Sequence, residues 1–176
     1  MDTRIDLYIR PTLDQTFPII IPFNMDFVNS HAGQHIAYRT TRDYRTLIRV
    51  NQDISLTRGK SGYPSNFKTA EAIIVTYNRI PRYMHPNTKF TYQIIIATDY
   101  QNTFVILNYD RIDSNGDGIG ISENGCVIDY ILNRSNQQRE LTWTSNVGRA
   151  GKHIFLMTQR HCKGCTFRFN YKILFY

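Results

Sequence analysis

The sequence has no long hydrophobic run. Its apolar stretches extend over only a few residues, far short of the roughly 20 that a membrane-spanning helix needs. Residues 1–6 also lack the apolar segment of a secretory signal peptide. We therefore expect no membrane span in this chain. Its start is typical of a cytosolic protein and, equally, of a fragment or an incomplete gene model.

The sequence also lacks the motifs that accompany common catalytic centres. It contains no Gly-x-Ser-x-Gly turn, no His-Glu-x-x-His helix and no glycine-rich phosphate loop. Its five histidines and its carboxylates, such as Asp26 and Asp99, form no recognisable acid–base pair. We therefore predict that the protein is not an enzyme.

Acidic residues are in short supply. The 21 Lys and Arg outnumber the 14 Asp and Glu, which gives a formal net charge of +7. An excess of positive charge favours polyanionic partners, namely acidic glycans, anionic membranes or nucleic acid. The basic residues are scattered, without a run of five like charges, and this is more typical of a solvated surface than of a phosphate-binding track.

Cysteine is scarce, with Cys126, Cys162 and Cys165 the only three. Cys162 and Cys165 are spaced like half of a zinc site, but a structural zinc site normally needs a second complete pair, and only Cys126 and His161 remain. Three readings stay open: a local disulfide between Cys162 and Cys165, a bridge from one of them to Cys126, or reduced thiols.

Tyrosine and phenylalanine, in contrast, are abundant, with 12 Tyr and 10 Phe. Both favour strands because they pack well on a half-buried pleated surface. Aromatic and β-branched runs predict strands at residues 19–21, 72–77, 90–97, 103–109, 153–157 and 167–175. The prediction is a mainly β protein, an antiparallel sheet or sandwich with one or two short helices. Residues 90–97 and 103–109 are expected to pair as a hairpin.

One segment, residues 41–54, favours a helix. Thr41 is its candidate N-cap, and apolar side chains recur on roughly one side of it. A fully buried strand is the competing interpretation. Residues 59–66 and 110–124 predict loops, Pro81 is expected to lie beyond the end of a strand, and the single tryptophan, Trp143, is expected in the core.

A candidate calcium loop lies in the second of these predicted loops. Asp113, Asn115 and Asp117 alternate ahead of Gly118, and oxygen ligands at alternate positions before a glycine are typical of calcium loops. An EF-hand needs Glu at the twelfth position, where Asn124 stands, so the loop is not an EF-hand. The alternative is an ordinary Gly/Asn/Asp turn. Apart from Ca²⁺ here, no cofactor is expected.

A candidate modification site follows at Asn133. Residues 133–135 read Asn-Arg-Ser, which fits the acceptor pattern for N-glycosylation. The pattern is common by chance, so it permits a secreted protein without requiring one.

Segments at residues 22–27, 75–80, 88–109 and 145–151 share an order and a spacing with a known family. They resemble the Pro-Phe-x-x-Asp, Val-Thr-Trp-Asp, Phe-Gln-x-x-Leu-Ala-Thr-Asp and Ser-Asn-Val-Gly-x-x-Gly motifs of the NIDO domain of nidogens and tectorins. The resemblance covers roughly residues 19 to 157, and it implies one domain over residues 1–176 that lacks the family's first strands. The motif residues are Pro22, Phe23, Asp26, Asp99, Asn146 and Gly148, expected to be scaffold first and binding surface second.

The resemblance implies an extracellular, non-enzymatic module of the matrix or of cell-matrix adhesion. Its expected partners are matrix or cell-surface proteins and, through the basic charge, acidic glycans. This reading predicts oxidised cysteines and a glycan at Asn133. The alternative is an intracellular nucleic-acid-binding β protein that uses basic charge and aromatic stacking.

Overall fold

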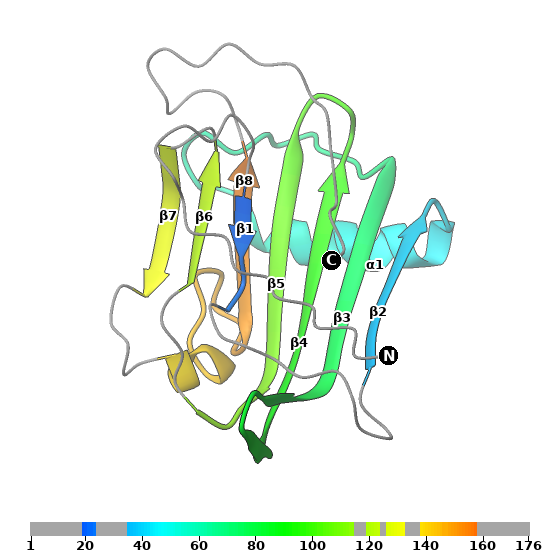
Figure 1. Ribbon diagram of the computed structural model, residues 1–176. Coiled ribbons are helices and arrows are strands. Elements are labelled where there is room, and N and C mark those ends of the chain that lie inside the picture. Colours follow the sequence, from blue (N-terminus) through cyan, green and yellow to red (C-terminus); the bar gives the residue numbers. More distant parts are fainter. Residues whose placement is uncertain (1–18, 24–34, 115–118, 124–125, 133–137, 158–176) are drawn as a thin grey trace.

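The computed structural model describes residues 19–23, 35–114, 119–123, 126–132 and 138–157 (Figure 1). In this part of the chain, eight strands form two antiparallel sheets, with one α-helix and two short 3-10 helices. The predicted class, mainly β with few short helices, is confirmed.

The larger sheet has five strands in the order β2-β3-β4-β5-β8, all antiparallel. Its strands are β2 (His35–Thr41), β3 (Glu71–Arg82), β4 (His85–Thr98), β5 (Thr103–Ile112) and β8 (Lys152–Met157). The predicted hairpin is confirmed as β4 and β5, which pair from Thr98 and Thr103 at the turn to Phe90 and Ile112.

The smaller sheet has three strands in the order β1-β6-β7. These are β1 (Ile19–Ile21), β6 (Ile119–Glu123) and β7 (Cys126–Leu132). Ile20 of β1 and the following Phe23 pack against one face of the larger sheet, which we call the sandwich face. Figure 1 shows α1 (Tyr44–Ile54) crossing the opposite face.

The N-cap of α1 lies two residues later than the sequence predicts. Asp43 is the N-cap, because its carboxylate accepts a 2.8 Å hydrogen bond from the Thr46 amide. Thr41 ends β2, and its hydroxyl accepts from the Asp43 amide, so the prediction of a Thr41 cap is wrong. A 3-10 helix, η1 (Ser55–Thr57), continues from α1.

The five-stranded sheet carries a separate hydrophobic cluster on each face. The sandwich face is rich in aromatic residues, including Phe23, Phe90, Tyr92, Tyr109 and Phe155. The helix-bearing face packs α1 against aliphatic strand residues and Phe104. Its members include Val50, Ile54, Ile74, Ile95, Ile106 and Ile154. Alternate residues of each strand therefore supply two different cores.

Three local predictions are wrong. Pro81 does not follow a strand end, because β3 continues to Arg82 and Pro81 pairs with Lys89 beyond a bulge. Residues 110–124 are not one loop, because β5 runs to Ile112 and β6 begins at Ile119. Trp143 is not in the core: it follows the 3-10 helix η2 (Gln138–Thr142), and its relative exposure is 61%.

The remaining local predictions divide into those confirmed and those outside the described residues. Residues 59–66 contain no helix or strand, as expected. The predicted strand at 167–175 lies outside the described residues. None of the helices in the described part of the chain is long and apolar enough to cross a membrane.

Candidate functional site

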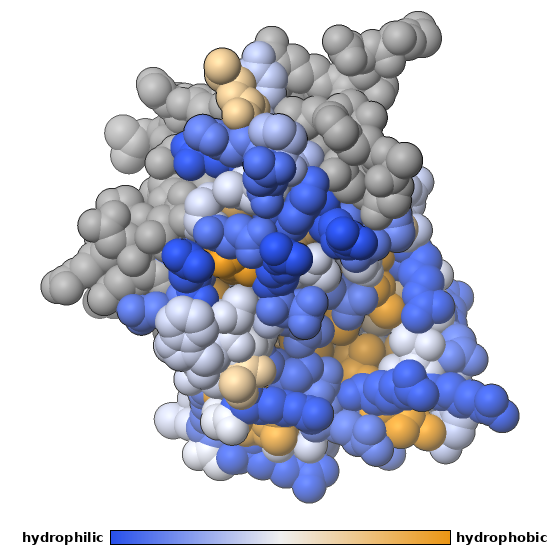
Figure 2. Space-filling view, turned by 90° about the horizontal axis from the view of Figure 1, so that it is seen from below, coloured by the Kyte–Doolittle hydropathy of each residue, from blue (hydrophilic) through white to orange (hydrophobic). Residues whose placement is uncertain are grey.

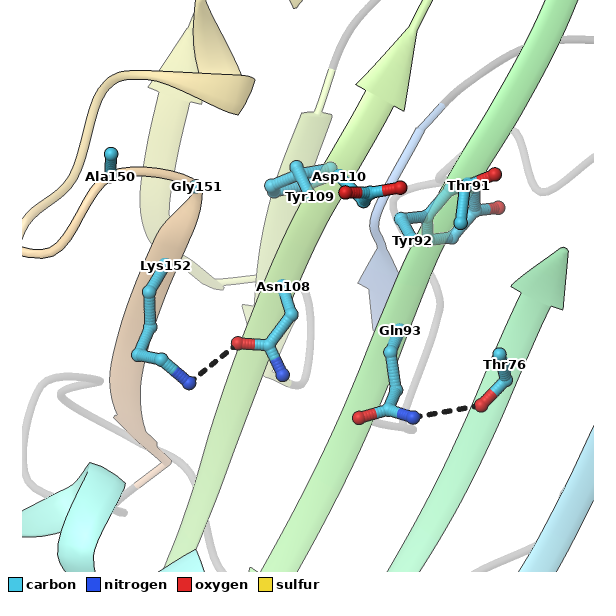
Figure 3. Close-up of a pocket in the computed structure, with 10 residues that line it drawn as sticks. All are labelled: Thr76, Thr91, Tyr92, Gln93, Asn108, Tyr109, Asp110, Ala150, Gly151 and Lys152. Atoms are coloured by element: carbon cyan, nitrogen blue, oxygen red, sulfur yellow. Dashed lines mark hydrogen bonds between the residues drawn. The ribbon is translucent and has the colours of Figure 1, made fainter. Parts of the chain in front are cut away.

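A row of polar side chains crosses the helix-bearing face of the large sheet. Thr76, Gln93, Asn108 and Lys152 are successive cross-strand partners on β3, β4, β5 and β8. Directly opposed residues share one face, so the four form a straight line beside α1 (Figure 3). The next line of partners toward the helix is apolar, through Ile74. We call these four residues the polar row.

Hydrogen bonds fix the polar row in place. Gln93 Nε2 donates to Thr76 Oγ1 over 2.8 Å. Lys152 Nζ donates to Asn108 Oδ1 over 2.7 Å and to Asp53 Oδ2 of α1 over 2.6 Å. The Lys152 side chain is only 11% exposed, so this ion pair is partly removed from water and more strongly held than a surface pair.

A cavity of about 320 Å³ opens over the polar row. Thr91 and Asp110 line its end away from α1, and Ala150 and Gly151 line its side along β8 (Figure 3). Amides, hydroxyls, one ammonium and one carboxylate together offer both donors and acceptors to a ligand. This chemistry suits a hydroxyl-bearing ligand held without covalent reaction.

Backbone irregularities shape this cavity. β3 bulges between Tyr77 and Ile80, where Arg79 has φ 55°, and β5 bulges at Asp110 opposite Thr91 and Tyr92. Gly151 has φ 74°, and a Cβ there would lie 2.5 Å from the backbone oxygen of Tyr109. Only glycine therefore allows β8 to begin so close to β5.

The loop before β8 seals the outer edge of that strand. Asn146 Nδ2 donates to the Ile154 carbonyl, and the Ile154 amide donates to Asn146 Oδ1, both over 2.9 Å. The amide thus takes the place of a neighbouring strand, which protects an edge that would otherwise pair with other chains. Gly148 supplies the positive φ of 74° that the turn needs. Both motif residues have structural roles.

The other motif residues are also bound into the scaffold. Phe23 is 5% exposed and packs on Phe90, with ring centroids 5.0 Å apart. The Pro22 carbonyl accepts a 2.7 Å hydrogen bond from the Tyr109 hydroxyl. Asp99 closes the β4–β5 turn by accepting from the Asn102 amide over 2.6 Å. Asp26 lies outside the described residues.

The candidate calcium loop is described only at its first residue. Asp113 accepts two hydrogen bonds from Arg111, at 2.7 and 2.8 Å, and one from the Lys89 amide. The arginine lowers the pKa of the Asp113 carboxyl and keeps it ionised. Asn115 and Asp117 lie outside the described residues, within which no three His, Cys, Asp or Glu side chains gather as metal ligands.

The predicted disulfide and glycan positions lie largely outside the described part of the chain. Cys162, Cys165 and Asn133 are among the residues that the structure does not describe. Cys126 is the first residue of β7. The cysteine pairing and the glycan at Asn133 therefore stay predictions.

One buried titratable group stands apart from the polar row. His153 is 4% exposed and faces the sandwich side, with its ring 5.9 Å from that of Tyr109. Burial lowers its pKa and favours the neutral imidazole. Its ring lies between the Tyr109 ring and the backbone of Leu141 and Thr144, so the side chain acts as part of the core.

Comparison with known families decides the identity of the domain. The model of the Nidogen-like domain, NIDO, matches residues 1–159 of the 176-residue chain. The chain belongs to the NIDO family. No curated protein and no solved structure matches it significantly. The sequence motifs that indicated this family begin with Pro22 and Phe23 after β1 and continue in strands β3 to β5 and in the loop before β8.

Sequence reasoning missed the polar row of this NIDO domain. Its members are ordinary Thr, Gln, Asn and Lys residues, and Thr76, Gln93 and Asn108 each have apolar or aromatic neighbours on both sides. A signal was present, because these three interrupt apolar runs at positions that face the same side of the sheet. Reading it required the strand register, which only the folded structure supplies.

Proposed function

We propose that this chain is a non-enzymatic extracellular module that acts in the matrix or in cell-matrix adhesion by binding a protein partner. The observation that carries this proposal is the family match over residues 1–159, because NIDO is a family of the extracellular-matrix type. The polar row supports a binding role, because hydrogen bonds hold its amide, hydroxyl and ammonium groups in fixed positions.

We infer that the protein-binding surface lies around Glu71. This residue begins β3 and contacts Arg42 in the segment between β2 and α1. Arg42 Nη2 and the Tyr100 hydroxyl both donate to Glu71 Oε2 over 3.3 Å, so one carboxylate holds both side chains. Tyr100 is 63% exposed, and the nearby Tyr44 is 75% exposed. Exposed tyrosine beside arginine is the composition that protein interfaces favour.

The test is secretion and matrix binding. We would express the chain behind a secretion signal in a eukaryotic host, verify its mass with and without reduction, and measure its retention on cell-derived matrix. We expect secretion, saturable retention and at least about a tenfold loss for the Tyr44→Ala/Tyr100→Ala variant, the scale of interface hot spots.

The matched control replaces two exposed residues at the β3–β4 turn, as Tyr83→Ala/Met84→Ala, whose relative exposures are 45% and 79%. This variant should retain wild-type binding. Failure of a folded protein to bind any matrix preparation would overturn the proposed function. Equal losses in both variants would overturn the assignment of the surface around Glu71.

A further inference from the structure

We propose that three arginines, Arg39, Arg45 and Arg49, together with the polar row, form a binding site for an acidic glycan chain that carries sulfate or uronate groups. The cationic side chains would hold the anionic groups, and the amides and hydroxyls of the row would hold the sugar hydroxyls. We call the three residues the arginine cluster.

The arginine cluster lies on β2 and along the first half of α1. Arg39 pairs with Ile74, so it is on the helix-bearing face of β2, and its charge contributes to lowering the pKa of Asp43, the N-cap of α1. Arg45 follows in the first turn of the helix, and Arg49 lies one turn further. The chain reversal between β2 and α1 therefore places the three arginines beside the first half of the helix, up to its midpoint at Arg49.

The cluster continues into the polar row. Arg45, Arg49 and Asp53 recur at intervals of four residues and so form one stripe along α1. Asp53 is the last residue of the stripe. Its carboxylate accepts a hydrogen bond from Lys152, which is a member of the polar row. A chain of sugars that followed this border would meet cationic groups on the helix side and neutral amides on the sheet side. The carboxylate of Asp110 lies at the far end of the cavity (Figure 3).

The charges of the cluster are available to a ligand. Arg39, Arg45 and Arg49 are all exposed, and within the described residues none of them has a side-chain ion pair or hydrogen bond. Other arginines differ: Arg42 is held by Glu71, and Arg111 by Asp113. An arginine fork binds sulfate or carboxylate through two parallel hydrogen bonds, which makes arginine well suited to anionic sugars.

The placement of aromatic side chains favours a glycan over a nucleic acid. Single-stranded nucleic acids are held by bases stacked on aromatic rings beside the cationic groups. Tyr38 precedes Arg39 in the strand and so faces the other side of β2. Tyr44 lies roughly 140° around the helix from Arg49. Figure 2, a view from below, shows mainly hydrophilic residues over the described surface that it displays, with hydrophobic ones in smaller areas between them.

This inference deepens the proposed function and rests on it, because sulfated and uronate-bearing chains are met outside the cell. The binding experiment uses purified protein, so its outcome is separate from that of the secretion test. Secretion without glycan binding would contradict only the proposed glycan site. Glycan binding by a protein that is never secreted would contradict only the proposed extracellular function.

The experiment measures binding of a fluorescent heparin octasaccharide by anisotropy at several salt concentrations. The test variant, Arg39→Gln/Arg45→Gln/Arg49→Gln, should lose about tenfold or more in affinity, and its dependence of log K on log salt should flatten by about 2. The matched control, Arg58→Gln/Lys68→Gln/Arg139→Gln, removes the same charge from exposed positions outside the cluster. It should change the affinity less than about threefold.

A second variant separates sugar recognition from charge. Thr76→Ala/Gln93→Ala should weaken the octasaccharide about threefold and leave the binding of inorganic polyphosphate unchanged, because polyphosphate has no hydroxyls for the amides. Circular dichroism would verify that each variant is folded. The proposal would be overturned if the wild type failed to bind at low salt or the control triple lost as much affinity as the test triple. Tighter binding of single-stranded DNA of equal charge, with the same arginine dependence, would overturn it too.

Discussion

The two faces of the five-stranded sheet are built differently, although the same strands supply both. The sandwich face is mostly apolar and aromatic and also carries His153. Its tyrosines lie side by side, with ring centroids 4.3 Å apart for Tyr77 and Tyr92 and 6.1 Å apart for Tyr92 and Tyr109. The helix-bearing face is apolar only where α1 covers it and then changes to the polar row.

The difference shows that the part of a sheet face that other elements cover carries apolar side chains, whereas the uncovered part carries polar ones. A covered face stabilises the fold by excluding apolar area from water, whereas an uncovered face must keep groups that water or a ligand can satisfy. The helix α1 has only 11 residues, about 16 Å of length, so it leaves part of its face open. The open part is where the candidate site lies.

The largest expected effect would test whether both faces are equally well packed. Phe90 on the sandwich face and Phe104 on the helix-bearing face are each 0% exposed. We expect Phe90→Ala and Phe104→Ala each to lower the free energy of unfolding by about 3–5 kcal/mol, because each leaves a cavity in a close-packed core. Urea denaturation would measure both. A loss under about 1 kcal/mol for Phe104→Ala would mean that α1 packs loosely.

The next effect concerns the turn that precedes β8. Gly151→Ala should destabilise the fold by about 3 kcal/mol, because it combines a positive φ with a contact to the Tyr109 carbonyl oxygen. Gly148 has the same φ of 74°, but a Cβ added there would have no described atom within 4 Å. Gly148→Ala should cost only about 1 kcal/mol. Equal melting temperatures for the two variants would contradict the close approach of β8 to β5.

A smaller effect on stability is expected from the ion pair that holds Lys152 of the polar row against α1. Asp53→Asn removes the negative charge that balances the Lys152 ammonium, and it should cost about 2 kcal/mol after allowance for the partial exposure of the pair. Adding Lys152→Met should recover part of this loss, because the unpaired charge is then gone. Urea denaturation of both single variants and the double variant would measure the coupling. Strict additivity would show that the pair is not coupled.

The smallest effect concerns the tyrosines of the sandwich face at high pH. Burial raises the pKa of Tyr92 and of Tyr109, so in the folded protein both stay protonated above pH 10, the ordinary value at which they ionise when unfolded. The unfolded state then binds fewer protons, and the free energy of unfolding should fall as pH rises above about 10. Below that pH these two groups should give no dependence.

The variant Tyr109→Phe tests this pH dependence directly. It should cost about 1 kcal/mol at neutral pH, because the Pro22 carbonyl loses its donor, and it should make the alkaline fall shallower. Urea denaturation between pH 8 and pH 11 would measure both effects. An alkaline slope unchanged from the wild type would show that Tyr109 is not the group responsible.

Strands with strong local patterns could be predicted from the sequence, and weakly patterned ones could not. β5 could be predicted because six of its residues are apolar or aromatic, and all six are buried in the structure. β2 was missed because five of its seven residues are exposed, as suits an edge strand, and its sequence has no period-two alternation. The cap moved from Thr41 to Asp43 because the hydroxyl of Thr41 accepts from Asp43 at the end of β2.

The sequence by itself determined the β-rich class, the β4–β5 hairpin and membership of the NIDO family, because these depend on local propensity and on ordered motifs. Only the tertiary structure decided which polar residues stand in one line and that Trp143 is exposed. It also decided that Lys152 meets Asp53, 99 residues away in the chain. Strand register and helix placement bring distant residues together, and no local pattern records either one.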